Sequence, residues 1–329
     1  MKKFLTWLIC LVLVCFCFAC KAGDSSSVTS PDGSTGDSSS GSDGTTDEII
    51  VNCLIDADFE LGFNLRGLDS VTDSGVVKSV KFTDEEPVWT VAQWWSGHNL
   101  KDGEEVLSDT DYSLKNAAKS VEIKRKNHSV TLGINGSEEF DTFNAVSPSK
   151  WPHLLLEQKI ADVPLADALK LEVKLDFTLT KNEDKRDADG KGFQSQFAWY
   201  IYIVDKNPES EGFGNFLWFG LNIFDSTKTY APATAQQDTA GGLGNFIYTL
   251  GAKDFMEKRV KTNVNNGFSF DILPSVKSAL EIAQSKGFMA GTTVEDCAVT
   301  GTNIGWEVFD RWDESIIIFD IAIDKTVKG

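Results

Sequence analysis

Hydrophobic and polar residues alternate most regularly over residues 168–179. Successive side chains of a β-strand point to opposite faces of a sheet, so this pattern predicts a strand with one buried and one solvated face. The outward positions are mostly charged, which is typical of an outer sheet. The predicted inward positions are Leu169, Leu171, Val173, Leu175, Phe177 and Leu179.

Residues 194–205 and 215–225 alternate in the same way but carry a different second face. The apolar set of the first segment is Phe197, Trp199, Ile201 and Ile203. Its other set consists of amides and flat rings: Gln194, Gln196, Tyr200 and Tyr202. Trp218 and Asn222 occupy the corresponding face of the second segment. We expect these two strands to share a sheet surface that meets a ligand.

A third segment, 153–158, adds two ionisable residues to this picture. Alternation places His153 and Glu157 on one face of a strand, about 13 Å apart along it. They are too far apart to touch each other, but both can line one cleft. A longer polar segment, 226–244, contains Gln236, Gln237 and Asp238, and a loop of that length in a compact domain is often functional.

Several other short apolar segments complete the pattern. They lie at 48–54, 76–82, 89–95, 121–124, 130–134, 245–250, 267–272, 297–299, 303–308 and 315–323. In the last of these, Ile317, Phe319, Ile321 and Ile323 are the predicted inward residues. One helix is predicted over 274–286, because Pro274 suits a first turn and Gly287 suits the end. Many short strands, one helix and no alternation of strands with helices predict a two-sheet antiparallel β-sandwich.

The N-terminus has a different composition from the rest of the chain. Lys2 and Lys3 precede an apolar run over 4–19, which is shorter than the ~20 residues of a membrane span and is typical of a secretory signal. Residues 20–47 are nearly all Ser, Gly, Asp and Thr and cannot bury enough apolar surface to fold. We therefore expect a flexible linker there and one β-sandwich domain over 48–329, which is long enough to bury a large core.

The apolar run ends in Ala19-Cys20. A small residue directly before Cys resembles the lipobox of bacterial lipoproteins, although Cys17 stands where that family usually has Leu. The resemblance implies that residues 1–19 are removed as a signal peptide and that Cys20 carries lipid. The protein would then be exported and anchored through lipid to the bacterial cell envelope, at the outer membrane or the cell surface.

Charge restricts the class of ligand. The chain holds 31 Lys and Arg against 49 Asp and Glu, a formal net charge of −18. Nucleic acids and polyanionic ligands need a positive surface, so this balance excludes them and favours a neutral or cationic partner.

Cysteine usage leaves two alternatives open. Four of the six Cys lie at or before position 20, so only Cys53 and Cys297 remain in the domain. In an oxidising compartment they can form one disulfide; otherwise they are two separately buried thiols. No Cys or His cluster predicts zinc.

The link over 181–192 contains Asp184, Asp187 and Asp189. These carboxylates allow a structural calcium loop, but Lys185 breaks the EF-hand spacing, and a charged hairpin loop with a turn at Asp189-Gly190 is the favoured interpretation. No other cofactor is predicted.

In aromatic content and strand pattern, the domain resembles the jelly rolls of bacterial carbohydrate-active proteins, and this resemblance implies a glycan ligand. Sugar rings stack on Trp and Tyr, and their hydroxyls need amide and carboxylate partners, which supports the same class independently. The candidate ligand-binding residues are Gln194, Gln196, Tyr200, Tyr202, Trp218, Asn222, His153 and Glu157.

Two alternatives to a membrane-anchored glycan-binding protein remain. As an enzyme, the chain would degrade polysaccharide with catalytic candidates His153, Glu157 and Tyr200. A lyase would use His153 or Tyr200 as its base. A glycosidase would pair Glu157 with Glu307 or Asp225. The third hypothesis is a structural or adhesion lipoprotein whose face meets a protein.

Overall fold

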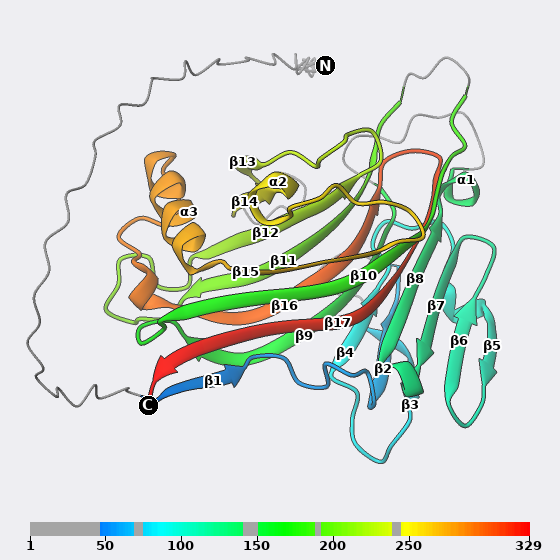
Figure 1. Cartoon of the computed structure of the whole chain (residues 1–329), viewed down its shortest axis with the longest axis horizontal. Coiled ribbons are helices and arrows are strands. Elements are labelled where there is room, and N and C mark those ends of the chain that lie inside the picture. Colours follow the sequence, from blue (N-terminus) through cyan, green and yellow to red (C-terminus); the bar gives the residue numbers. More distant parts are fainter. Residues whose placement is uncertain (1–46, 69–74, 141–150, 188–191, 239–244) are drawn as a thin grey trace, which may run out of the picture. The chain divides into compact units, whose positions relative to one another are not determined.

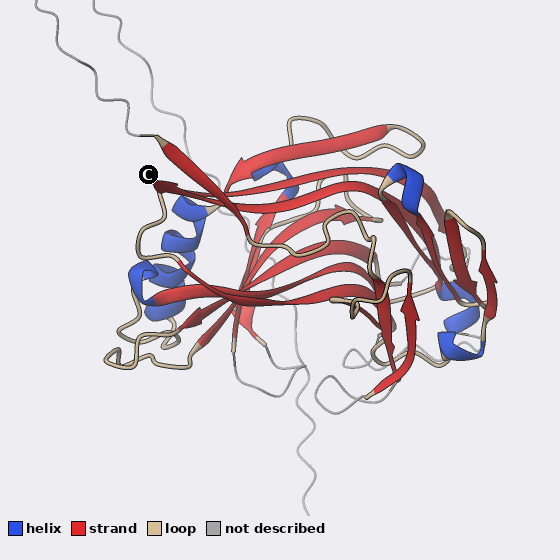
Figure 2. Cartoon of the chain, turned by 90° about the horizontal axis from the view of Figure 1, so that it is seen from below, coloured by secondary structure: helices blue, strands red, loops and turns tan. Residues whose placement is uncertain are grey.

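The computed structural model describes residues 47–68, 75–140, 151–187, 192–238 and 245–329 (Figure 1). The predicted signal peptide, the lipidation site Cys20 and nearly all of the 20–47 linker lie outside the described residues. The described chain forms two β-sheets that face each other as separate layers (Figure 2). The expected all-β fold, a two-sheet sandwich of the jelly-roll class, is therefore confirmed.

One layer, the outer sheet, has eight strands and contains the regular strand predicted over 168–179. Its path is β15 (Asn265–Asp271), β10 (Lys170–Asp184), β17 (Trp312–Lys328), β8 (Ser129–Asn135), β7 (Lys119–Lys124), β6 (Asp111–Lys115) and β5 (Glu104–Leu107), with β1 (Glu48–Asn52) paired to β17. All of its strand pairs are antiparallel.

The other layer, the cleft sheet, has nine strands and contains all three segments expected to carry the ligand face. Its order is β13 (Thr234–Gln237), β14 (Phe246–Gly251), β12 (Phe216–Asp225), β11 (Ser195–Asp205), β16 (Cys297–Val308), β9 (His153–Pro164), β4 (Trp89–Ala92), β2 (Gly62–Arg66) and β3 (Val76–Lys81).

The cleft sheet is mixed, which corrects the expectation of purely antiparallel pairing. β12 pairs with β14 in parallel, and β2 pairs with β4 in parallel. After β12 the chain first forms the edge strand β13 and then returns through β14, which inserts between β13 and β12. Because the chain reaches β14 through β13 and not directly from β12, β14 can run in the same direction as β12.

The core fills the space between the two sheets. Phe197, Trp199, Ile201 and Ile203 of β11 are fully buried, as predicted, and so are the alternate residues of β10 from Leu171 to Leu179. Leu169 was predicted to face inward, which is wrong: it precedes β10 and is 50% exposed.

The last strand departs from simple alternation. Ile321 and Ile323 are buried as predicted, but Phe319 is 38% exposed and Ile318 is buried. Phe177 pairs with Ile318 and the preceding residue of β10 pairs with Asp320, so Phe319 is an extra residue in a β-bulge. A bulge shifts the alternation by one residue, which is why the side chain of Ile317 also does not face inward.

The predicted helix is present as α3 (Leu273–Ser285), with Pro274 in its first turn and Gly287 just after its end at φ +85°. Its buried stripe includes Val276, Ala279, Leu280 and Ala283. The pattern did not predict the one-turn helices α1 (Gly136–Glu139) and α2 (Ala252–Phe255), or three short 3-10 turns at Leu100–Asp102, Arg125–Asn127 and Val294–Asp296. No helix in the described part of the chain is long and apolar enough to span a membrane.

The remaining structural expectations concern Cys and calcium. Cys53 and Cys297 are both free and buried, so the alternative of two separate thiols holds. Asp184 accepts hydrogen bonds from the Arg186 guanidinium. Asp189 and Gly190 of the calcium hypothesis lie outside the described residues.

Candidate functional site

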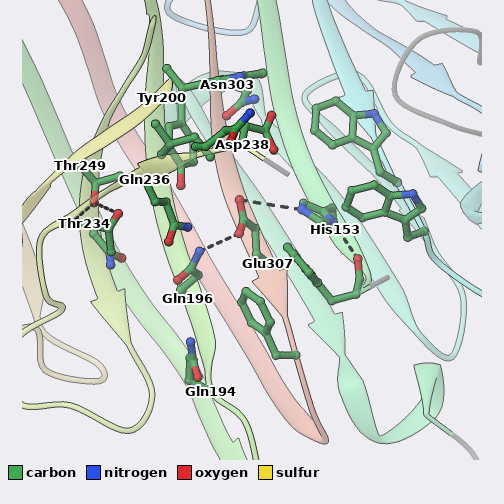
Figure 3. A pocket seen from close by; sticks show the side chains of 18 residues that line it. His153, Gln194, Gln196, Tyr200, Thr234, Gln236, Asp238, Thr249, Asn303 and Glu307 are labelled. Atoms are coloured by element: carbon green, nitrogen blue, oxygen red, sulfur yellow. Dashed lines mark hydrogen bonds and ion pairs between the residues drawn. The ribbon is translucent and has the colours of Figure 1, made fainter. Parts of the chain in front are cut away.

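A cavity of about 340 Å³ opens on the face of the cleft sheet that points away from the core (Figure 3). Strand register explains why its residues meet. Gln196, Glu307 and His153 pair across β11, β16 and β9 and form one row. The lining residues are Trp94, Trp95, Trp151, His153, Gln194, Gln196, Tyr200, Trp218, Asn222, Thr234, Gln236, Gln237, Asp238, Ile247, Thr249, Asn303, Glu307 and Phe309.

Small residues on this face of the sheet leave space for the cavity and for larger neighbouring side chains. Ala198 and Gly305 pair with each other between the row of Glu307 and the row of Tyr200. A Cβ on Gly305 would lie 2.2 Å from the carbonyl oxygen of Leu154, and a Cβ on Gly220 would lie 2.7 Å from the ring of Tyr200. The ring of Tyr200 therefore lies over the neighbouring strand at Gly220, where only glycine leaves room for it.

Aromatic rings form one wall of the cavity. β4 ends at Ala92, and Trp95 has a positive φ of 53°, so the chain turns out of the sheet and brings both Trp94 and Trp95 to the cavity. The His153 ring lies 5.6 Å from Trp94, 5.2 Å from Trp95 and 5.8 Å from Trp151. Trp151 stacks on Phe309 with ring centroids 4.6 Å apart.

Amides and hydroxyls form the other wall. Gln196 of β11, Thr234 and Gln236 of β13 and Thr249 of β14 all line the cavity (Figure 3). Thr234 and Thr249 share a hydrogen bond of 2.7 Å between their hydroxyls. This wall offers donors and acceptors to a ligand, opposite flat rings that offer apolar contact.

Besides the indole nitrogen of Trp151, four buried polar atoms of the cavity lining have no hydrogen-bond partner among the described residues. Two are donors, the indole nitrogens of Trp94 and Trp218, and two are acceptors, the amide oxygens of Asn222 and Asn303. Asn222 is 5% exposed and Asn303 is 2% exposed. Leaving such groups unpaired costs about 1–3 kcal/mol each, so a ligand that supplies both donors and acceptors gains affinity here.

Glu307 is the central carboxyl of the cavity. Its Oε2 accepts a 2.6 Å hydrogen bond from Gln196, and burial raises its pKa to about 7. The Gln196 bond and the Trp151 indole oppose that shift, and the negative charge of Asp238 adds to it. At neutral pH this carboxyl exists in both protonation states.

His153 stands beside Glu307 in its neutral form. Burial lowers its pKa to about 4. Its Nδ1 lies 2.7 Å from the carbonyl oxygen of Trp151, so this nitrogen carries the proton. Nε2 then presents a lone pair at 3.8 Å from Oε1 of Glu307. The contact is therefore not an ion pair at neutral pH.

Tyr202 and Glu157 share this face of the sheet but are not among the cavity-lining residues. Arg66 Nη1 lies 3.0 Å from the Glu157 carboxylate, and Asn303 donates a 3.0 Å hydrogen bond to the Tyr202 hydroxyl. Burial raises the pKa of Glu157 to about 7 despite Arg66.

The register argues against a catalytic pair of Glu157 and Glu307. Glu157 pairs with Asn303, which precedes Glu307 by four residues on β16, so the backbones of the two glutamates lie about 13 Å apart along the strands, and Glu157 is not among the cavity-lining residues. The two carboxyls of a glycosidase are about 5–10 Å apart. Asp225 accepts hydrogen bonds from Thr227 and does not line the cavity.

The structure brings six of the eight sequence candidates to the cavity: Gln194, Gln196, Tyr200, Trp218, Asn222 and His153. Sequence reasoning missed Asn303, Thr234 and Thr249 as site residues. Asn303 follows the same alternation as Glu307, so the pattern over 303–308 could have identified Asn303 as a site residue. Trp95 and Trp151 had no such signal, because their positions depend on loops.

No family model matches the sequence, and no curated protein matches it. Among solved structures, a family 12 xyloglucanase from Bacillus licheniformis is similar, with 11% identity, a TM-score of 0.38, and 68% of this chain and 97% of that chain covered. The xyloglucanase domain of NopAA from Sinorhizobium fredii, in complex with cellobiose, has 12% identity and a TM-score of 0.37 over 70% of this chain and 98% of that domain.

A third similar structure is the endoglucanase cel12A from Rhodothermus marinus, with 9% identity, a TM-score of 0.35, and 69% of this chain and 96% of that chain covered. At these identities and TM-scores, the functional conclusion rests on the residues of the cavity and not on these enzymes.

Proposed function

We propose that this chain binds an oligo- or polysaccharide, neutral or cationic rather than polyanionic, in the cavity of the cleft sheet. The four unpartnered polar atoms at Trp94, Trp218, Asn222 and Asn303 are the observation that carries this proposal. A sugar hydroxyl both donates and accepts, so a polyhydroxylated ligand can satisfy both kinds of atom at once.

The rest of the lining supports the same ligand class. Sugar C–H faces pack on aromatic rings, which the wall of Trp94, Trp95 and Trp151 provides. No Lys or Arg is among the cavity-lining residues of the described chain, so a polyanion finds no counter-charge there.

The direct test is retardation of the protein during electrophoresis through gels that contain polysaccharide. Trp218→Ala and Tyr200→Ala each remove a ring from the cavity, and we expect affinity to fall at least about tenfold, as at aromatic hot spots. Phe319→Ala is the matched control, because it removes a partly exposed ring from the outer sheet. Retardation that is unchanged in both cavity variants, with folding intact, would contradict the site.

Hydrolysis is the second candidate function, and one observation favours it. Glu307 is a buried carboxyl with a pKa near 7, and the charge of Asp238 acts on it. A general acid needs such a pKa. Release of reducing ends from a polysaccharide panel, lost in Glu307→Gln, would favour catalysis; binding without release would favour a receptor. A lyase fits less well, because His153 is a weak base and no Lys or Arg of the described residues lines the cavity to hold a substrate carboxylate.

We further propose that the protein is exported and held to the bacterial cell envelope by lipid on Cys20, on the strength of the N-terminal sequence alone. Metabolic labelling with a radioactive fatty acid should mark the wild-type chain and not Cys20→Ala. If the glycan panel is silent and the chain captures an envelope protein through this face, the adhesion hypothesis replaces the glycan proposal.

A further inference from the structure

A buried ion pair contacts the loop that carries part of the aromatic wall, residues 94–99, here called the wall loop. Lys119 is the first residue of β7, and Glu139 is the last residue of α1. The Lys119 Nζ lies 2.6 Å from Oε1 of Glu139, and both side chains are fully buried. Lys119 alternates with the buried residues Val121 and Ile123 of β7, and neither member of the pair is among the cavity-lining residues. The pair therefore lies outside the cavity, on the core side of the outer sheet.

Among the described residues, the two side chains otherwise form hydrogen bonds only to the wall loop. The Lys119 ammonium donates to the Ser96 hydroxyl and to the carbonyl oxygen of His98. The Glu139 carboxylate accepts a hydrogen bond from the Ser96 hydroxyl and another, of 2.6 Å, from the amide of Gly97. All three N–H groups of the ammonium thus have acceptors, and three successive residues of the loop are fixed by one ion pair.

Trp95, which directly precedes these three residues, has a backbone conformation that needs support. Its φ of 53° is rare for a bulky residue, and such a conformation persists only where surrounding contacts impose it. Trp94 has an anchor of its own, because its carbonyl oxygen accepts a 3.0 Å hydrogen bond from the amide of His153. The bonds from the ion pair to residues 96–98 fix the direction in which the chain leaves Trp95.

We propose that the Lys119–Glu139 pair is a positioning element of the cavity: by fixing residues 96–98, it holds Trp95 in the conformation that brings its ring to the aromatic wall. This inference rests on the proposed glycan-binding function, in which the Trp95 ring is one of the surfaces that a sugar packs on. A buried ion pair is often replaced by apolar residues of similar volume without loss of stability, so a role in positioning can be separated from a role in folding.

The double variant Lys119→Met with Glu139→Leu separates the two roles. Apolar side chains of similar volume keep the core filled, but residues 96–98 lose their partners. The probes are xyloglucan and hydroxyethyl cellulose, two neutral soluble polysaccharides, in retardation gels with the intact chain. We expect affinity to fall about tenfold, as for the loss of an aromatic hot spot, and Trp95→Ala to cause the same fall.

A combination of variants shows whether the pair acts through Trp95. Adding Trp95→Ala to the double variant should cause no further loss of affinity, because both changes remove the same ring from the wall. Lys174→Met is the matched control, since it removes a lysine from an exposed ion pair of the outer sheet, and it should bind as wild type does. A folded double variant that binds as tightly as wild type would overturn the positioning role and leave the glycan cleft standing.

The indole N–H resonance of Trp95 in the ligand-free chain gives a readout that does not depend on binding. It should shift in the double variant and also in Ser96→Ala, which removes a hydroxyl bonded to both members of the pair but keeps the pair itself. The indole resonance of Trp199, which donates to Thr302, should stay in place. An unshifted Trp95 resonance in both variants would overturn the positioning role. If no polysaccharide retards wild type, the glycan proposal fails, and a shifted Trp95 resonance still supports the positioning role.

Discussion

On the outer sheet, Lys174 of β10 forms an ion pair with Asp320 of β17, and their side chains are 45% and 43% exposed. On the cleft sheet, the outward positions of β11 and β16 hold Gln196, Asn303 and Glu307, which are largely buried in the cavity. Both sheets use the same alternation, with apolar residues facing the core. They differ in whether the outward polar groups keep their contact with water.

Burial determines how much each polar residue contributes to the free energy of folding or binding. Exposed charges exchange one set of partners for water at little cost, whereas a buried polar group that loses its partner pays the full cost of desolvation. Substitutions of buried polar residues should therefore have larger effects than substitutions of exposed ones, and the difference should reveal which face carries function.

The largest effect is expected at Lys119 and Glu139, a buried ion pair beside the aromatic wall. Lys119 Nζ lies 2.6 Å from Glu139, both side chains are 0% exposed, and the pair also binds Ser96. Lys119→Met leaves the Glu139 carboxylate buried without its counter-charge, which should lower the free energy of unfolding by about 3–5 kcal/mol. Urea denaturation followed by circular dichroism measures this change.

A double variant separates charge from packing at the same place. Lys119→Met combined with Glu139→Leu replaces the pair by apolar side chains of similar volume and should recover most of the loss. If the single variant is as stable as wild type, the side chains are not buried as described.

The next effect depends on pH and concerns Glu314, a carboxyl buried between the sheets that accepts a hydrogen bond from Ser195. Burial raises its pKa from 4.5 to about 8, so the folded state holds the proton more tightly than the unfolded state. The stability due to this proton is complete below pH 4.5 and is lost as pH rises through about 8.

Glu314→Gln should remove that dependence. Between pH 5 and pH 9, we expect the unfolding free energy of wild type to fall relative to that of the variant by on the order of a few kcal/mol. The melting temperature of wild type should fall with it. Thermal melts at both pH values measure it. Parallel pH profiles for the two proteins would show that Glu314 ionises as freely as a surface glutamate.

The smallest effect is expected at the exposed pair of the outer sheet. Lys174→Met removes one partner of Asp320 in a setting where water replaces it, so stability should change by less than about 1 kcal/mol. Glycan retardation should not change at all. A loss of binding in this variant would place function on the outer sheet and reverse the comparison.

Alternation was enough to predict the two sheets and six of the eight cavity residues proposed, because period two sorts each strand of a sandwich into faces. It failed at Phe319, where a bulge adds one residue and reverses the faces that follow. It also failed at Glu157, since a residue on the correct face can still lie outside the cavity. The row that joins Gln196, Glu307 and His153 depends on pairing between strands that are distant in the sequence. The pattern within one strand does not predict that pairing.

The aromatic wall shows a second limit. Residues 89–95 were expected to form one strand, and alternation along such a strand would place Trp94 and Trp95 on opposite faces. The strand ends at Ala92, and the positive φ of Trp95 turns both rings toward the cavity. A non-glycine residue in that conformation is held there by tertiary contacts, and these cannot be derived from the pattern of the segment itself.

Indole N–H resonances in NMR spectra test the central claim, that the unpartnered polar atoms of the cavity receive a glycan. The indoles of Trp89, Trp199, Trp306 and Trp312 donate to partners within the protein, whereas those of Trp94 and Trp218 do not. On addition of saturating oligosaccharide, we predict that the resonances of Trp94 and Trp218 shift and that the other four stay in place. Unmoved Trp94 and Trp218 signals, or shifts confined to the internally bonded indoles, would contradict the account.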